Sequence, residues 1–287
     1  MPDDRAPSSS RYAALDGLRG LCALLVALFH LPIASHVYTS PLLRDAYVFV
    51  DFFFVLSGFV IAHAYGARLG TNGAVGSFLV RRVGRLWPLH LAVLAVLVAL
   101  ELGKLAFVGH MTDDMRPPFS GDTGISSLLA NIFLVHAWGF SNSGSWNVPS
   151  WSISAELFAY LAFAAVCRFL PRRATLVATL IVVGGLLLLV FATNADTASH
   201  LLAIRAAVGF FLGTLVYRVF SATGTPRWRP ALATTLEALV AIAVLAYLAL
   251  VELPDLSVVA TPLFAVAIYV FAAGRGALSR LLGTRPM

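Results

Sequence analysis

The chain has 287 residues, of which 59% are hydrophobic and 12% are charged, and its mean hydropathy is +0.86. An ordinary soluble domain carries about a quarter charged residues, so this composition excludes a soluble protein and indicates a polytopic membrane protein. The net charge of +6 does not indicate nucleic-acid binding, because the basic residues gather in short loops, where they set membrane topology.

Apolar stretches long enough to cross a bilayer recur along the chain. Residues 1–10 are polar and are expected to form a disordered cytoplasmic tail, and residues 11–287 a single membrane-embedded domain. We predict an all-α transmembrane bundle of about eight spans. The expected spans are 13–31, 46–65, a third that ends near 108, 150–170, 174–192, 199–219, 230–251 and 257–273.

Residues 124–138 form an apolar stretch that is too short to span comfortably. If this stretch does not cross, all of the 20 lysines and arginines except Arg44, Lys104, Arg116 and Arg205 lie on the cytoplasmic side. If it did cross, every later basic cluster would move outside, against the positive-inside rule. We therefore predict a re-entrant or interfacial segment, in a multi-pass protein of the plasma or inner membrane whose N-terminus is cytoplasmic.

The first span carries ionisable residues at both ends. Arg19 and His30 are eleven residues apart, which places them on one helix face about 16 Å apart along the axis. An ionisable residue in lipid indicates function, and a histidine is a suitable general base near neutral pH. The alternative is that His30 reaches the interface ahead of Pro32 and has no chemical role.

The second span contains Asp51 and Ser57. Asp51 lies near the outer end, at a depth comparable to that of His30, where it would orient His30 or a substrate hydroxyl. Alternatively, it is an acid at a helix N-terminus, stabilised by the helix dipole. Ser57 and Gly58 lie near the bilayer centre, where small residues also serve close helix packing.

Three arginines, Arg81, Arg82 and Arg85, precede the third span. Guanidinium groups at the inner surface suit a phosphate-bearing ligand, although arginines beside a tryptophan also serve as positive-inside anchors. His63 and His90 lie towards the inner side without the ligand spacing of a metal site, so no metal is predicted.

The stretch from Trp146 to Glu156 is harder to explain by packing alone. Glu156 lies more than one turn inside the predicted helix 150–170, and a carboxylate at that depth needs a partner or a proton. Arg205 and His30 are the candidate partners at similar depth.

Together these segments resemble the integral-membrane acyltransferase-3 family. The resemblance rests on Arg-x10-His at Arg19 and His30, F-F-x-x-S-G at 53–58, and R-x-x-R at Arg82 and Arg85. It rests also on the family's tryptophan-serine-leucine-x-x-glutamate element, matched through Trp151, Ser152 and Glu156, and on the helix from Arg205 to Gly213. One such match would be weak, but five in register are specific.

The resemblance implies an acyltransferase for groups other than amino-acyl groups, with no bound cofactor. The donor would be cytoplasmic acyl-CoA, typically acetyl-CoA, and the acceptor a hydroxyl of an extracytoplasmic glycan or glycosylated metabolite. Arg19, Arg82 and Arg85 would bind the CoA phosphates. His30 would deprotonate the acceptor or carry the acyl group, in a direct or a two-step transfer. The implied catalytic residues are His30, Asp51 and Glu156, and the implied substrate-binding residues are Arg19, Ser57, Arg82, Arg85, Trp151 and Arg205.

The sequence departs from the family pattern in two places. Leu157 replaces a polar residue after the glutamate, and the chain stops at Met287, before a stretch and two helices with which the family usually continues. We therefore expect a C-terminally truncated domain. A transporter or flippase of an acyl or glycan intermediate, or an inactive truncated homologue, are the alternative functions.

Overall fold

The computed structural model describes residues 12–31, 40–70, 73–106, 116–139, 144–191, 200–250 and 257–284. Every regular element within these ranges is a helix, which confirms the predicted all-α fold class. The predicted tail at 1–10 lies outside the described residues. The chain forms two compact units, residues 1–56 with 216–287 and residues 57–215, and passes from one to the other within α3 (Phe49–Tyr65) and within α9 (Leu202–Thr223).

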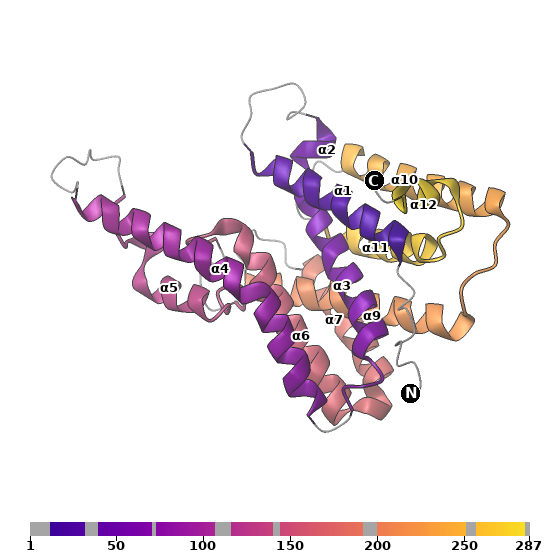
Figure 1. Cartoon of the computed structure of the whole chain (residues 1–287), viewed down its shortest axis with the longest axis horizontal. Coiled ribbons are helices and arrows are strands. Elements are labelled where there is room, and N and C mark those ends of the chain that lie inside the picture. Colours follow the sequence, from indigo (N-terminus) through magenta and orange to yellow (C-terminus); the bar gives the residue numbers. More distant parts are fainter. Residues whose placement is uncertain are drawn as a thin grey trace, which may run out of the picture. The chain divides into compact units, whose positions relative to one another are not determined.

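The first unit is built around its terminal helices. α10 (Pro230–Leu250) packs against α11 (Ser257–Ala272) and α12 (Ala277–Leu282), and α1 (Ala13–Phe29) packs against α12 (Figure 1). The buried carboxylate of Glu237 on α10 accepts hydrogen bonds from the backbone nitrogens of Gly276, at 2.9 Å, and Ser279, at 3.1 Å. Because these N–H groups begin α12, Glu237 caps that helix and fixes it to α10.

The second unit is built around an aromatic core. α4 (Ala74–Ala106) lies beside α6 (Trp151–Phe169), which is followed by α7 (Ala174–Phe191) (Figure 1). Buried aromatic rings from α4, α6 and α9 meet edge to face in this core. The rings belong to Phe78, Tyr160, Phe163, Phe210 and Phe211.

Among the described residues, six helices are long and apolar enough to cross a bilayer: Ala46–Tyr65, Ala74–Ala106, Val148–Phe169, Pro171–Phe191, Leu202–Thr223 and Pro230–Leu250. The two other expected spans form α1, of 17 residues, and α11, of 16 residues. The total of about eight spans therefore stays a prediction. With its 33 residues, α4 is about 50 Å long, which exceeds the hydrocarbon thickness and lets it extend beyond the bilayer.

The segment predicted as re-entrant or interfacial contains only a short helix, α5 (Ile125–Ile132). Eight residues rise about 12 Å, too little to cross a bilayer. The polar side chains of Ser127 and Asn131 are buried, whereas the apolar side chains of Ile125, Leu129 and Phe133 are exposed. This reversed amphipathicity suits a short helix whose outer face contacts lipid.

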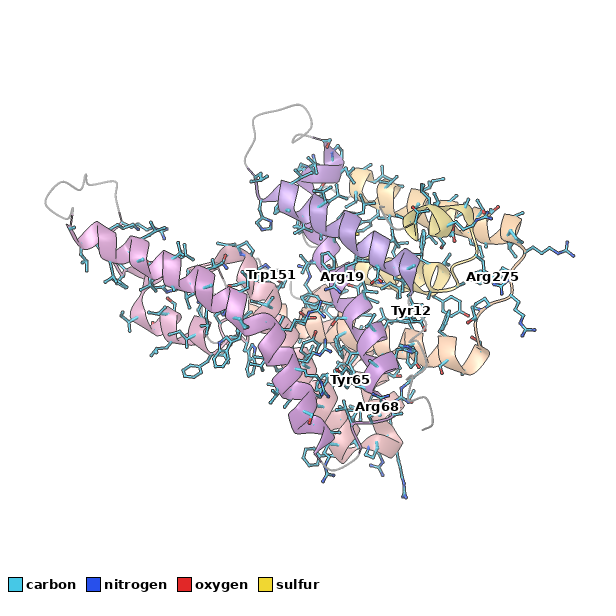
Figure 2. All side chains as sticks on the ribbon, viewed as in Figure 1. Tyr12, Arg19, Tyr65, Arg68, Trp151 and Arg275 are labelled. Atoms are coloured by element: carbon cyan, nitrogen blue, oxygen red, sulfur yellow. The ribbon has the colours of Figure 1, made fainter. Side chains whose placement is uncertain are left out.

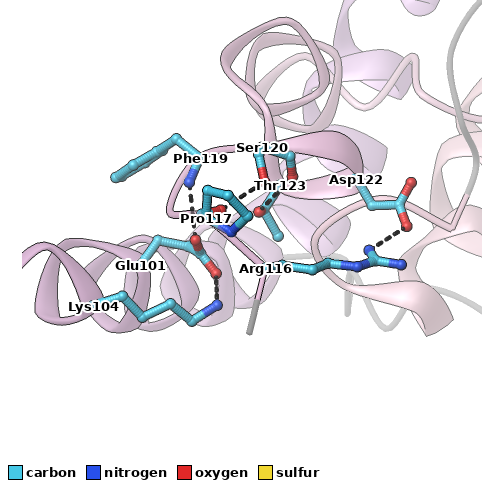
Figure 3. A network of polar contacts seen from close by, with 8 residues as sticks. All are labelled: Glu101, Lys104, Arg116, Pro117, Phe119, Ser120, Asp122 and Thr123. Carbon is cyan, nitrogen blue, oxygen red and sulfur yellow. Dashed lines mark hydrogen bonds and ion pairs between the residues drawn. The ribbon is translucent and has the colours of Figure 1, made fainter. Parts of the chain in front are cut away.

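The residues before α5 are attached to the C-terminal end of α4 (Figure 3). The buried carboxylate of Glu101 forms an ion pair with Lys104 and accepts a hydrogen bond from the backbone nitrogen of Phe119 at 3.1 Å. Arg116 and Asp122 form a second, exposed ion pair at 3.1 Å. A buried carboxylate is tolerated only when it is paired in this way, so Glu101 fixes the start of the α5 segment on α4.

Candidate functional site

A hydrogen-bonded group of three side chains connects α3 and α6 in the second unit. Ser57 Oγ donates to Glu156 Oε1 at 2.7 Å, and Tyr160 OH donates to the same oxygen at 2.5 Å. The hydroxyl oxygens of Ser57 and Tyr160 are 3.2 Å apart. Glu156, which α6 places inside the helix bundle, therefore has two hydroxyl groups that donate to its carboxylate.

The structure therefore gives Glu156 different neighbours from those expected. Within the described part of the chain, its hydrogen bonds go to Ser57 and Tyr160 rather than to Arg205. Arg205 instead lies over the ring of Trp151, with its guanidinium carbon 5.9 Å from the ring centroid. Figure 2 labels Trp151 at the start of α6, five residues before Glu156. Two contacts therefore lie next to each other along α6. One is the hydrogen bond between Ser57 and Glu156, and the other is the contact of Arg205 with the ring of Trp151.

Arg82 points from α4 into the same region. Its Nη2 donates to the hydroxyl of Tyr65 at 3.2 Å, and its guanidinium carbon lies 5.9 Å from the ring centroid of Tyr160. Its Nε is buried and has no hydrogen-bond partner among the described residues. Arg82 therefore brings a positive charge close to the Ser57–Glu156–Tyr160 group.

Arg85 has a different setting from Arg82. It is exposed, whereas Arg82 is half-buried among aromatic rings. Arg81 is also exposed, and its guanidinium carbon lies 5.6 Å from the ring centroid of Tyr65, which Figure 2 labels at the end of α3. The two arginines of the R-x-x-R element therefore differ in exposure: Arg85 is available to a polar ligand at the surface, and Arg82 is half-buried among aromatic rings.

Arg19 lies on α1 in the first unit, and His30 directly follows the last residue of this helix. His30 Nδ1 donates to the backbone oxygen of Val26 at 2.8 Å, so the neutral ring carries its lone pair on Nε2. The His30 side chain is exposed, as is that of Arg19. Since α1 is a continuous helix from Ala13 to Phe29, the predicted separation of about 16 Å along one helix face holds.

Asp51 lies in the first turn of α3 and is 1% exposed. The end of α1 lies near the start of α3, because the ring of Phe29 is 5.9 Å from that of Tyr47 and 5.0 Å from that of His30. The structure therefore places the helix ends that carry His30 and Asp51 in one region of the first unit.

Two buried histidines in the second unit were not predicted as a pair. The rings of His90, on α4, and His136, after α5, are nearly parallel with centroids 6.0 Å apart. His90 Nε2 donates to the backbone oxygen of Asn131 at 2.9 Å. Ser150 Oγ donates to the backbone oxygen of Asn147, so His136 Nε2 must donate to Ser150 Oγ at 3.1 Å.

Both histidines therefore carry a proton on Nε2, and their Nδ1 atoms have no hydrogen-bond partner among the described residues. Burial, and the adjacent His90, lower the pKa of His136 to about 4. Together with Ser154 Oγ, which donates to the backbone oxygen of Leu134 at 2.8 Å, they fix the α5 segment to α4 and α6. Within the described ranges, no three His, Cys, Asp or Glu side chains come together as a metal site.

Tyr160, Tyr65 and His136 are the side chains that sequence reasoning missed. Tyr160 follows Glu156 by four residues and so had to share its helix face, a spacing that could have identified it. The contacts of Tyr65 and His136 join segments far apart in the sequence, and no local pattern indicates them.

The family model described as "Acyltransferase domain" matches residues 12–284. The chain belongs to the acyltransferase-3 family. This match confirms the resemblance seen in the sequence and, with it, the enzyme class of an acyltransferase.

Several curated proteins are similar to this acyltransferase-3 chain. Protein 2 in the picA locus of Rhizobium radiobacter is 32% identical over 160 residues, which cover 54% of this chain and 81% of that protein. Acyltransferase MdmB of Streptomyces mycarofaciens is 30% identical over 58% of this chain and 42% of its own length. Peptidoglycan O-acetyltransferase OatA of Listeria monocytogenes is 28% identical over 53% of this chain and 23% of its own length.

The aligned part is thus most of the picA-locus protein but less than half of MdmB and of OatA. No solved structure matches the chain.

Proposed function

We propose that this acyltransferase-3 protein is a membrane O-acyltransferase that moves an acyl group, typically acetyl, from cytoplasmic acyl-CoA to a hydroxyl of an extracytoplasmic glycan or glycosylated metabolite. The observation that carries the proposal is the state of His30, whose Nδ1 is bonded to the helix backbone and whose Nε2 lone pair is available. The names of two relatives, an acyltransferase and a peptidoglycan O-acetyltransferase, support this class of reaction.

The donor would bind through its phosphates. Arg19 on α1 and Arg85 on α4 are both exposed, and these helices correspond to the first and third predicted spans. A guanidinium group can donate two parallel hydrogen bonds to the oxygens of one phosphate. Arg82 would hold its charge deeper, beside Tyr65. The gap of about 16 Å between Arg19 and His30 is within reach of the extended arm that joins the CoA phosphates to the thioester.

His30 would act as the base of the transfer. Nε2 accepts the proton of the acceptor hydroxyl, and the hydroxyl oxygen attacks the thioester carbonyl carbon. The carbon–sulfur bond then breaks and the CoA thiolate leaves. The thiolate then takes the proton from His30. In the two-step alternative, Nε2 attacks the thioester carbonyl carbon and the carbon–sulfur bond breaks as the CoA thiolate leaves. The acceptor hydroxyl then attacks the acyl group, the carbon–nitrogen bond to His30 breaks, and the hydroxyl proton passes by way of His30 to the thiolate.

Asp51 and Glu156 would each assist the transfer. Asp51, buried in the first turn of α3, would orient His30 or the acceptor hydroxyl. Glu156 is held by Ser57 and Tyr160, and these groups would bind the polar part of a substrate together with Trp151 and Arg205. The protein would lie in the plasma or inner membrane with its N-terminus in the cytoplasm, as the distribution of arginines indicates.

The donor side of the proposal is tested with sealed inside-out vesicles and acetyl-CoA labelled in the acetyl group. Arg19→Gln should raise the KM for acetyl-CoA about tenfold with little change in kcat, because a charge-assisted contact to phosphate is lost. Arg280→Gln, which removes another exposed arginine of the first unit, should leave the KM unchanged.

The same assay separates transfer from transport. A transferase releases one free CoA thiol for each labelled acetyl ester that forms on the acceptor. A flippase would move label without releasing the thiol, and that result would reject the proposed reaction.

A further inference from the structure

A hollow of about 570 Å³ opens in the first unit, at the turn between α9 and α10. Its wall is formed by the end of α9, by the segment that connects α9 to α10, and by Arg275. Arg275 precedes Gly276, where the turn into α12 begins. The lining residues are Thr223, Gly224, Thr225, Pro226, Arg227 and Arg275. Gly224 has a φ of +72°, a conformation that glycine adopts freely and that lets the chain fold back around the hollow.

The hollow is positively charged. Arg227 and Arg275 both line it, both are exposed, and the lining contains no acidic side chain. Within the described part of the chain, neither arginine forms an ion pair. Two guanidinium groups that face one hollow without a neutralising carboxylate suit an anion with several acceptor oxygens, and a phosphate ester is the best match to their geometry.

An aromatic pair adjoins the hollow. Tyr269 OH lies 3.4 Å from Thr223 Oγ1, and its ring meets that of Trp228 edge to face at 6.2 Å. Thr223 already donates to the backbone oxygen of Val219 at 2.9 Å, so Tyr269 is the donor in the first contact. Tryptophan and tyrosine at the ends of apolar helices mark the level of lipid headgroups.

We propose that this hollow binds the headgroup phosphate of an anionic phospholipid. The arginines would hold the phosphate, and the Trp228–Tyr269 pair would lie at the boundary between headgroup and acyl chains. The hollow lies on the side that the arginine distribution assigns to the cytoplasm, where anionic lipids attract basic residues near the membrane surface. This site is separate from the residues assigned to acyl transfer, so its test does not depend on that activity.

The test uses the full chain, purified in a neutral detergent and titrated with dioctanoyl-phosphatidylglycerol or dioctanoyl-phosphatidylcholine, with bound lipids counted by native mass spectrometry. We expect the anionic lipid to bind at least tenfold more tightly than the neutral lipid. The double variant Arg227→Gln/Arg275→Gln should lose this preference. The control Arg172→Gln/Arg173→Gln removes two exposed arginines from a turn in the second unit and should keep it.

Three results would overturn the proposal. The first is equal affinity of the wild-type chain for the two lipids. The second is an unchanged preference in the Arg227/Arg275 variant, or an equal loss in the control. The third concerns the source of the phosphate, because CoA also carries phosphate esters. If CoA at micromolar concentration displaces phosphatidylglycerol from the wild-type chain, and does so only when Arg227 and Arg275 are present, the hollow belongs to the donor rather than to a lipid. The thermal stability of every variant is also measured. It should equal that of the wild-type chain, because the substituted arginines are exposed.

Discussion

The Glu156 carboxylate is held by two hydroxyl groups, one from its own helix and one from α3. Since a single carboxylate oxygen accepts both bonds, losing either donor weakens the support of a partly buried charge. The guanidinium group of Arg82 contacts the ring of Tyr160, so a substitution at Tyr160 also changes the surroundings of Arg82.

Tyr160→Phe removes one donor from Glu156 and keeps the ring that packs in the core. We expect the free energy of unfolding to fall by about 1.5–3 kcal/mol, the range for a hydrogen bond to a charged group, and acyl transfer to fall about tenfold or more. Thermal unfolding in detergent and the labelled-acetyl assay measure the two effects. Ser152→Ala is the matched control, because Ser152 lies on the same helix and, within the described ranges, its hydroxyl donates only to the backbone oxygen of Pro149. Wild-type stability and activity in Tyr160→Phe would show that this hydroxyl has no such role.

The lowered pKa of His136 should make the stability of the folded protein depend on pH. Its pKa is about 4 in the folded protein, below the ordinary value of 6.5, because burial and His90 disfavour the charged ring. The unfolded chain therefore binds a proton at His136 at a higher pH than the folded chain does. Stability should consequently fall as the pH drops from about 6.5 to about 4, by roughly 3 kcal/mol at most.

His136→Gln keeps an N–H donor for Ser150 and removes the titrating ring. Its thermal midpoint should change less between pH 7 and pH 4.5 than that of the wild-type chain, measured by unfolding in detergent at both values. An equal pH dependence in the two proteins would assign the effect to other groups.

At the scale of helices, the contact between α3 and α9 depends on a residue without a side chain. A Cβ atom at Gly58 would overlap the backbone oxygen of Phe210, which cannot move without shifting α9. Gly84, on α4, has no atom within 4 Å of the same position and is exposed. Both glycines lie inside helices, but the position of Gly58 has no space for a Cβ atom, whereas that of Gly84 does.

Gly58→Ala should destabilise the protein by several kcal/mol or prevent its folding, because the two backbones must separate. Gly84→Ala should be neutral or stabilising by about 0.5–1 kcal/mol, the usual gain for alanine in a helix. Thermal unfolding of the two variants side by side makes the comparison. Equal stability of both would contradict the close packing of α3 against α9.

The helices themselves were largely predictable, because runs of apolar residues such as 46–65 and 174–192 carry a strong local signal. The α5 segment was predicted to be too short to span, but its reversed amphipathicity follows from Asn131 and Ser127 packing inward, which depends on tertiary contacts. Likewise, the depth of Glu156 was visible in the sequence. Its partners were not, because Ser57 comes from a helix 99 residues away.

At the scale of the whole chain, the topology rests on one segment. If 124–138 does not cross the bilayer, Arg172 and Arg173 are cytoplasmic, and a compartment reporter fused after Arg173 should give a cytoplasmic signal. The same reporter fused after Lys104 should give an extracytoplasmic signal. An extracytoplasmic signal after Arg173 would require 124–138 to cross and would reverse the orientation of every later helix.

Acyl transfer through His30 is the central claim for the whole protein, and one measurement tests it most directly. Sealed inside-out vesicles that contain the wild-type chain or His30→Ala are given labelled acetyl-CoA, and ester-bound label and free CoA thiol are counted together. Membrane insertion is checked by the amount of intact protein in the vesicles. We predict that His30→Ala inserts like the wild-type chain but forms no labelled ester and releases no CoA thiol above background. Acetyl transfer that persists in His30→Ala would contradict the account.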